Sequence, residues 1–108
     1  MDIKSLLKLL VETESPSHEK AAVDRVGAIV AEEARKIGAE IEVIPNKETG
    51  DHVIARWKGE GKPILLVCHM DTVFPLGTIE KFPYREDEGK IMGPGVSDMK
   101  ASIAISLG

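Results

Sequence analysis

Two short segments of the chain carry side chains that could bind a metal ion. His69 and Asp71 follow an apolar run at residues 64–68, and Asp98 lies in a glycine-rich loop further along the chain. Imidazole and carboxylate groups held near strand and helix ends suit a Zn²⁺ site of the hydrolytic kind. One histidine and two aspartates are too few ligands for a complete catalytic centre. The sequence therefore predicts part of a metal site.

The spacing of these residues limits the role of each. Side chains two positions apart on a strand point the same way, so we expect His69 and Asp71 on one side and Cys68 on the other. Asp71 could fix the second imidazole nitrogen of His69 or bind metal directly, and spacing does not choose between these roles. Asp98 precedes an apolar helical segment, where an aspartate is often only an N-cap. Its two oxygens could instead bridge two cations about 3.5–4 Å apart.

Composition places the chain among ordinary globular proteins. Its 108 residues are 43% hydrophobic and 30% charged, with a net charge of −4, which argues against nucleic acid or an anionic membrane as partner. The start lacks the pattern of a signal peptide, and no apolar run reaches the length of a membrane span. Cys68 is the single cysteine, so no internal disulfide can form. We expect a cytoplasmic protein with Cys68 buried as a small apolar side chain.

Hydrophobic periodicity predicts two helices at the beginning of the chain. Apolar residues spaced three and four apart indicate a helix over about residues 2–13 and a second over about residues 18–37. Ser15-Pro16-Ser17 separates them and is expected to supply the N-cap of the second helix. Gly38 suits the position that follows its last turn.

Strands are expected after the helices. Residues 41–44 and 52–58 form the first two, and residues 64–69 form a third, antiparallel beside the second. The third is apolar on both faces, so we expect it to be central and covered. A turn at residues 87–89 precedes a short strand at residues 90–92. The fold class is therefore α/β, a mixed sheet flanked by helices.

Other chemically capable residues are expected to be structural. His18 and His52 have no carboxylate in a matching position and are expected to be ordinary surface histidines, and Glu32-Glu33 should lie on a solvated helix face. Residues 101–108 are apolar and predict the first turns of a buried helix. From that last feature we expect residues 1–108 to be the N-terminal segment of a longer protein.

The two site segments together resemble a known family. The motifs at residues 67–75, 82–84 and 89–100 (Val-Cys-His-Met-Asp-Thr-Val-Phe-Pro, Phe-Pro-Tyr and Gly-Lys-Ile-Met-Gly-Pro-Gly-Val-Ser-Asp-Met-Lys) look like the N-terminal part of M20 zinc metallopeptidases. The sequences of these motifs are similar to those of glutamate carboxypeptidases of the carboxypeptidase G2 kind. Cys68 and Tyr84 are mild departures from the family pattern. The resemblance covers essentially the whole chain.

This resemblance implies roles for the site residues. The segment would belong to a catalytic domain with two Zn²⁺ ions per complete site, or Co²⁺ or Mn²⁺ in their place. His69 would bind one ion, Asp98 would bridge both, and Asp71 would serve catalysis by orienting His69. The peptide bond after Asp98 is expected to be cis. The general base, the other ligands and a lid domain used for homodimerisation would lie beyond residue 108, so the segment alone should be inactive.

The resemblance also implies a substrate class and leaves alternatives open. The complete protein would be a carboxypeptidase that releases a glutamate-like C-terminal residue from a small peptide. An aminoacylase or deacetylase acting on N-acyl amino acids is the alternative within the family. A small binding module without catalysis is the alternative from another class, and a second polypeptide could also supply the missing ligands.

Overall fold

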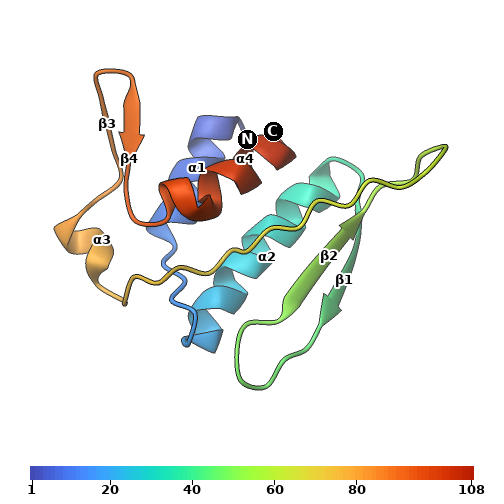
Figure 1. The fold of residues 1–108 in the computed structure, drawn as a ribbon, viewed down its shortest axis with the longest axis horizontal. Coiled ribbons are helices and arrows are strands. Elements are labelled where there is room, and N and C mark those ends of the chain that lie inside the picture. The colour runs from blue at the N-terminus through green and yellow to red at the C-terminus, as the bar shows by residue number, and fades with distance from the viewer.

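Helices and two small sheets make up the fold of this computed structural model, which describes all 108 residues (Figure 1). β1 pairs with β2 and β3 with β4, each pair antiparallel. This confirms the α/β class. In chain order the elements are α1 (Ile3–Glu12), α2 (Lys20–Lys36), β1 (Glu40–Ile44), β2 (His52–Arg56), α3 (Thr78–Lys81), β3 (Arg85–Asp87), β4 (Lys90–Met92), the irregular turn η1 (Val96–Lys100) and α4 (Ala101–Leu107).

The two long helices form where the periodicity predicts them. Asp2 caps α1, because its carboxylate accepts a hydrogen bond of 2.7 Å from the Ser5 amide. α2 is followed by Gly38, whose φ of +95° is the left-handed conformation that often ends a helix. No helix in the structure combines the length and the apolar character needed to cross a bilayer.

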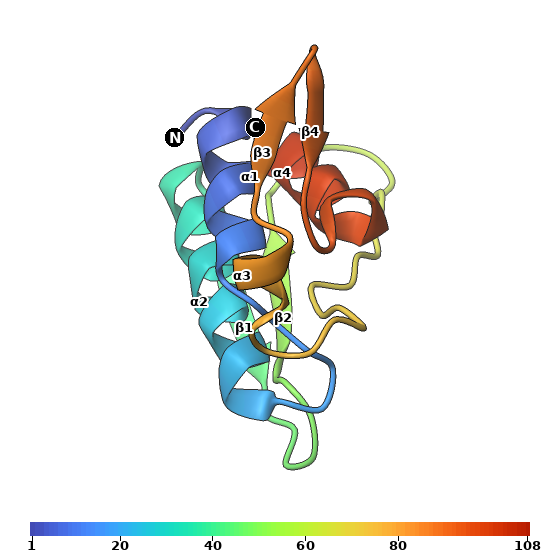
Figure 2. The same ribbon diagram turned by 90° about the vertical axis from the view of Figure 1, so that its left-hand side faces the viewer.

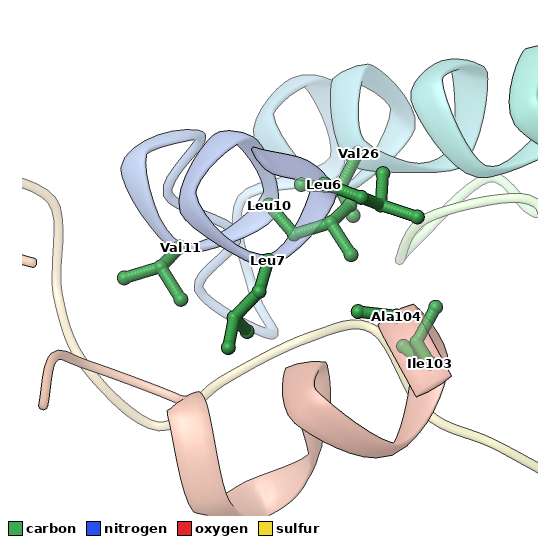
Figure 3. Packing of buried hydrophobic residues seen from close by; sticks show 7 residues of the cluster. All are labelled: Leu6, Leu7, Leu10, Val11, Val26, Ile103 and Ala104. Carbon is green, nitrogen blue, oxygen red and sulfur yellow. The ribbon is translucent and has the colours of Figure 1, made fainter. Parts of the chain in front are cut away.

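The hydrophobic core lies where α1, α2 and α4 meet (Figure 3). Leu10 of α1 and Val26 of α2 are fully inaccessible to solvent, and Ile103 and Ala104 of α4 close the cluster. Burying one such leucine stabilises a fold by about 1.5–3 kcal/mol. The predicted helix at the end of the chain is thereby confirmed, and its apolar face rests on α1.

The hairpin β1–β2 is held to α2 by a polar cluster. The Lys20 ammonium lies 2.9 Å from the Asp24 carboxylate and 2.6 Å from that of Asp51. Asp24 also accepts a hydrogen bond of 2.8 Å from the Asp51 amide. Hydrogen bonding to Lys20 comes first among the causes that lower the pKa of both carboxyl groups. The cluster fixes the loop before β2 against the first turns of α2.

The hairpin β3–β4 confirms the predicted turn. Glu88 and Gly89 join the strands and have φ values of +49° and +78°. Two successive residues with positive φ match the right-handed twist of the flanking strands. The hairpin projects from the body of the molecule (Figures 1 and 2).

The third strand predicted at residues 64–69 is absent, so the prediction of one mixed sheet is wrong. Both figures draw this segment as plain coil between β2 and α3. Its apolar side chains are 70–90% exposed, and Cys68 is also exposed rather than buried. A strand that is apolar on both faces needs neighbours at its edges and layers above and below. These 108 residues supply none of them, so the segment stays extended and unpaired.

The N-cap predicted from Ser15-Pro16-Ser17 is also wrong. The residue before α2 is Glu19, and no side chain caps that helix. The backbone at Pro16 instead forms a parallel bridge with Thr72, which follows the predicted metal-binding segment. The linker between the first two helices therefore lies against residues 70–72.

Candidate metal centre

His69 lies between the two aspartates that the sequence singles out. Its Nε2 is 2.8 Å from Oδ1 of Asp98. Its Nδ1 is 3.2 Å from the backbone carbonyl oxygen of Asp71 and 3.3 Å from Oδ1 of the same residue. The three residues predicted to form the site therefore converge on one imidazole. Each ring nitrogen has its own aspartate, which is the division of roles that the family resemblance implies.

The surroundings of His69 change its affinity for a proton. Desolvation acts to lower the pKa of His69, but the hydrogen bonds to Asp98 and to the Asp71 backbone, with the two negative charges, outweigh it and raise that pKa above its ordinary value. A metal ion at Nε2 would compete with the proton for this nitrogen. Metal binding at His69 should therefore weaken as the pH falls.

The loop that carries Asp98 is shaped by Gly95. This glycine has a φ of +78°, and a Cβ at its position would lie 2.7 Å from Cγ2 of Thr72. The loop therefore approaches the segment after Asp71 more closely than any side chain would allow. Asp98 and Met99 have non-helical backbone angles inside the turn η1. This irregular turn carries the carboxylate back toward His69.

The peptide bond between Asp98 and Met99 is cis, as the family resemblance implies. Next to it, the thioether sulfur of Met99 accepts a hydrogen bond of 3.3 Å from the backbone amide of His69. The two site segments are thus joined twice, once through side chains and once through this contact.

Lys100 holds the same turn to α1, and the sequence analysis did not identify it. Only 1% exposed, its ammonium donates hydrogen bonds of 2.6 Å to the Leu10 carbonyl and 3.0 Å to the Thr13 carbonyl. Desolvation lowers the pKa of Lys100 to about 8, although the nearby Glu14 charge opposes that shift. The sequence feature that could have identified Lys100 is its position as a lone lysine inside an otherwise apolar segment.

The linker between α1 and α2 also contacts the His69 segment. We call residues 14–17 the anchor segment. The Ser15 hydroxyl donates to the Met70 carbonyl at 2.7 Å, and the Ser15 carbonyl accepts from the Thr72 amide at 2.8 Å. The Ser17 amide donates to the Thr72 carbonyl, and the Ser17 hydroxyl donates to the Asp71 carboxylate while lying 3.1 Å from the Thr72 carbonyl oxygen. Sequence reasoning missed these contacts because both serines resemble helix-capping residues.

The remaining chemically capable residues lie outside the site. His18 and His52 are exposed, as predicted. Glu33 is buried on α2 and pairs with Lys36 at 3.0 Å, so the prediction of a fully solvated Glu32-Glu33 pair is wrong for its second member.

The donor set fits part of a metal site. One imidazole nitrogen and one carboxylate oxygen meet at 2.8 Å, and both are donors that Zn²⁺ accepts. No group of three or more histidine, cysteine, aspartate or glutamate side chains is placed to hold an ion. Asp98 is 83% exposed and His69 49% exposed, so the two are open to further ligands. The arrangement could supply two ligands of a larger set, with Asp71 contacting the far side of the ring.

Comparison with known proteins identifies the same segments. Residues 65–108 match the model of peptidase family M20/M25/M40, and all three site residues fall within that match. The chain is 34% identical to carboxypeptidase G2 of Pseudomonas sp. (strain RS-16), over 97% of this chain and 26% of that protein. It is 34% identical to acetylornithine deacetylase of Photorhabdus laumondii subsp. laumondii, over 94% of this chain and 29% of that protein. The chain thus spans between a quarter and a third of the length of these relatives. In these matches and in the motifs that carry its site, the chain is similar to peptidase family M20/M25/M40.

Proposed function

We propose that the chain supplies the N-terminal part of the catalytic domain of a metal-dependent hydrolase that cleaves a peptide or amide bond. The observation that carries this proposal is the contact of 2.8 Å between His69 Nε2 and Asp98 Oδ1, with Asp71 on the opposite ring nitrogen. Both ligands lie in the residues that match the family model.

His69 and Asp98 would hold the metal, and we propose a pair of Zn²⁺ ions bridged by Asp98, with Co²⁺ or Mn²⁺ as substitutes. Such ions polarise a substrate carbonyl and lower the pKa of water. Asp71 keeps the imidazole in one orientation and accepts from its Nδ1, so that Nε2 faces the metal. The general base and remaining ligands are proposed to come from outside these 108 residues, and the segment by itself should not catalyse hydrolysis.

The substrate we propose is a small peptide with a glutamate-like C-terminal residue. Support comes from the sequences of the motifs and from the similarity of the chain to carboxypeptidase G2. An N-acyl amino acid is the second candidate, supported by the equal identity to acetylornithine deacetylase. We further propose that the complete protein acts as a homodimer in the cytoplasm.

The test compares His69→Ala with His52→Ala in the complete protein. The first removes a proposed ligand, and the second removes an exposed histidine outside the site. We expect His69→Ala and Asp98→Ala to lose both bound zinc and hydrolysis, whereas His52→Ala keeps both. Zinc content by elemental analysis and hydrolysis of a glutamate-terminated dipeptide measure the result. Near-normal turnover of Asp98→Ala would refute the bridging role.

The same preparation separates the two substrate classes. Hydrolysis of N-acetyl amino acids without cleavage of the dipeptide would select the deacylase alternative. Zinc binding without any hydrolysis would select a non-catalytic module.

A further inference from the structure

We propose that Ser17 is a positioning residue of the metal site, which holds Asp71 so that Asp71 can hold His69. This rests on the proposed function only in that the site is taken to bind a metal. The hydrogen bond from the Ser17 hydroxyl to the Asp71 carboxylate is the observation that carries it. Asp71 then contacts Nδ1 of His69, whose other nitrogen faces Asp98.

The Asp71 carboxylate divides its two oxygens between these neighbours. Oδ2 accepts from Ser17, while Oδ1 lies 3.3 Å from the imidazole of His69. Without Ser17, Oδ2 has no other side-chain donor among the hydrogen bonds of the structure, and the carboxylate could rotate about χ2. Rotation would remove Oδ1 from Nδ1, and that nitrogen would keep only its contact of 3.2 Å with the Asp71 backbone carbonyl. The Ser17 hydroxyl therefore fixes a side chain two steps away from the metal.

Ser17 is itself held in place through its backbone and its side chain. Its amide donates to the Thr72 carbonyl at 3.0 Å, and its hydroxyl lies 3.1 Å from the same oxygen. Ser15 adds the contacts to Met70 and Thr72 described above. The backbone register of the anchor segment is thus set by contacts that do not involve the Ser17 hydroxyl. Removing that hydroxyl should leave the register intact and free only the carboxylate.

Ser15 provides the matched control. Its hydroxyl joins the same two segments, but it donates to the Met70 carbonyl and does not touch Asp71. Ser15 is fully buried, so Ser15→Ala should cost at least as much stability as Ser17→Ala. A purely structural role would therefore affect both variants alike, whereas a positioning role affects only Ser17→Ala. Ser17→Thr retains a hydroxyl and should restore the wild-type behaviour.

The primary measurement is the χ1 and carboxylate orientation of Asp71, with χ1 of His69, from NMR couplings and carboxyl shifts in the metal-free 108-residue chain. We expect one conformation in wild type, Ser15→Ala and Ser17→Thr, and averaging of Asp71 or His69 in Ser17→Ala. Unchanged couplings and shifts in Ser17→Ala, or equal averaging in Ser15→Ala, would overturn the proposal. Thermal melts of all four proteins show whether any variant is unfolded at the temperature of the NMR measurement. Where a variant is unfolded, Ser17→Thr is compared with wild type instead, and a different Asp71 conformation in these two proteins would also overturn the proposal.

Titration of the complete protein with Co²⁺ alone then tests the consequence for the metal, because the remaining ligands are proposed to lie outside these 108 residues. Outer partners of metal ligands typically contribute 10–100-fold to affinity, so a residue one step further out should contribute roughly threefold to tenfold. We expect that loss in Ser17→Ala and none in Ser15→Ala. Equal affinity of Ser17→Ala and wild type, where His69→Ala abolishes binding, would overturn the proposal. If wild type binds Co²⁺ no better than His69→Ala, the metal-binding function fails, while the NMR result still decides whether Ser17 orients Asp71.

Discussion

Replacement of Gly95 by alanine should destabilise the fold through two separable effects. The first is conformational, because the φ of +78° costs an L-residue about 1–2 kcal/mol. The second is steric, because the new Cβ would lie 2.7 Å from Cγ2 of Thr72, where carbon atoms prefer about 3.5–4.0 Å. Thr72 is 7% exposed and its amide is bonded to Ser15, so the methyl group has little room to move. Such overpacking costs about 1–3 kcal/mol, which brings the expected total for Gly95→Ala to about 2–5 kcal/mol.

Two further variants separate these effects in urea denaturation followed by circular dichroism. Gly38→Ala is the conformational control, since Gly38 has a φ of +95° and open space around its Cβ position. It should lose only about 1–2 kcal/mol. Thr72→Ser removes the methyl group and keeps the hydroxyl, so the double variant with Gly95→Ala should recover about 1–3 kcal/mol of the loss. A cost of Gly95→Ala no larger than that of Gly38→Ala, or no recovery with Thr72→Ser, would refute the steric contribution of the Thr72 methyl group.

Three other predictions follow from the core and from the charged side chains. Leu10→Ala should cost about 2–5 kcal/mol in urea denaturation, because Leu10 is fully buried, whereas Ile105→Ala, at a 64% exposed site of α4, should cost under about 0.5 kcal/mol. The pKa of Asp51 is lowered from 3.8 in the folded protein, so its carboxylate stabilises the fold at pH values above 3.8, and this stability is lost as the pH falls through the lowered pKa. Melting temperatures measured from pH 7 to 2.5 should therefore fall less steeply in Asp51→Asn than in wild type. Because the folded pKa of Lys100 is about 8 against an ordinary 10.5, the unfolded chain binds more protons between these values, and stability should rise with pH there in wild type but not in Lys100→Met. A flat stability profile of wild type over that interval would contradict the assignment of Lys100.

Local sequence patterns predicted the three helices of the core and the turn between β3 and β4, but not α3 or the strand β3. α1, α2 and α4 follow from apolar spacing, and the turn at Glu88 and Gly89 follows from residue type. These features depend on neighbours within a few positions, which the sequence displays directly. The third strand depends on partners elsewhere in space, and its apolar residues could indicate only that the segment needs other elements to pack against it.

The candidate site was predicted in part. His69, Asp71 and Asp98 meet as the motifs indicate, although His69 and Asp71 do so without the strand that motivated their pairing. Ser17 and Lys100 contact residues far away in the sequence, so the residues next to them in the sequence do not predict those contacts. Ser17 resembled a helix cap, and Lys100 interrupted an apolar run without an evident reason.

The anchor segment also bears on the order in which the chain folds. The Ser17–Asp71 bond spans 54 positions, and Lys100 reaches Leu10 across 90. Closing such long loops is entropically costly and slows folding more than it weakens the folded state. During synthesis, the anchor segment leaves the ribosome well before the residues it will hold. The helices and the β1–β2 hairpin can gain order locally, and His69, Asp71 and Asp98 should reach their places among the last events of folding.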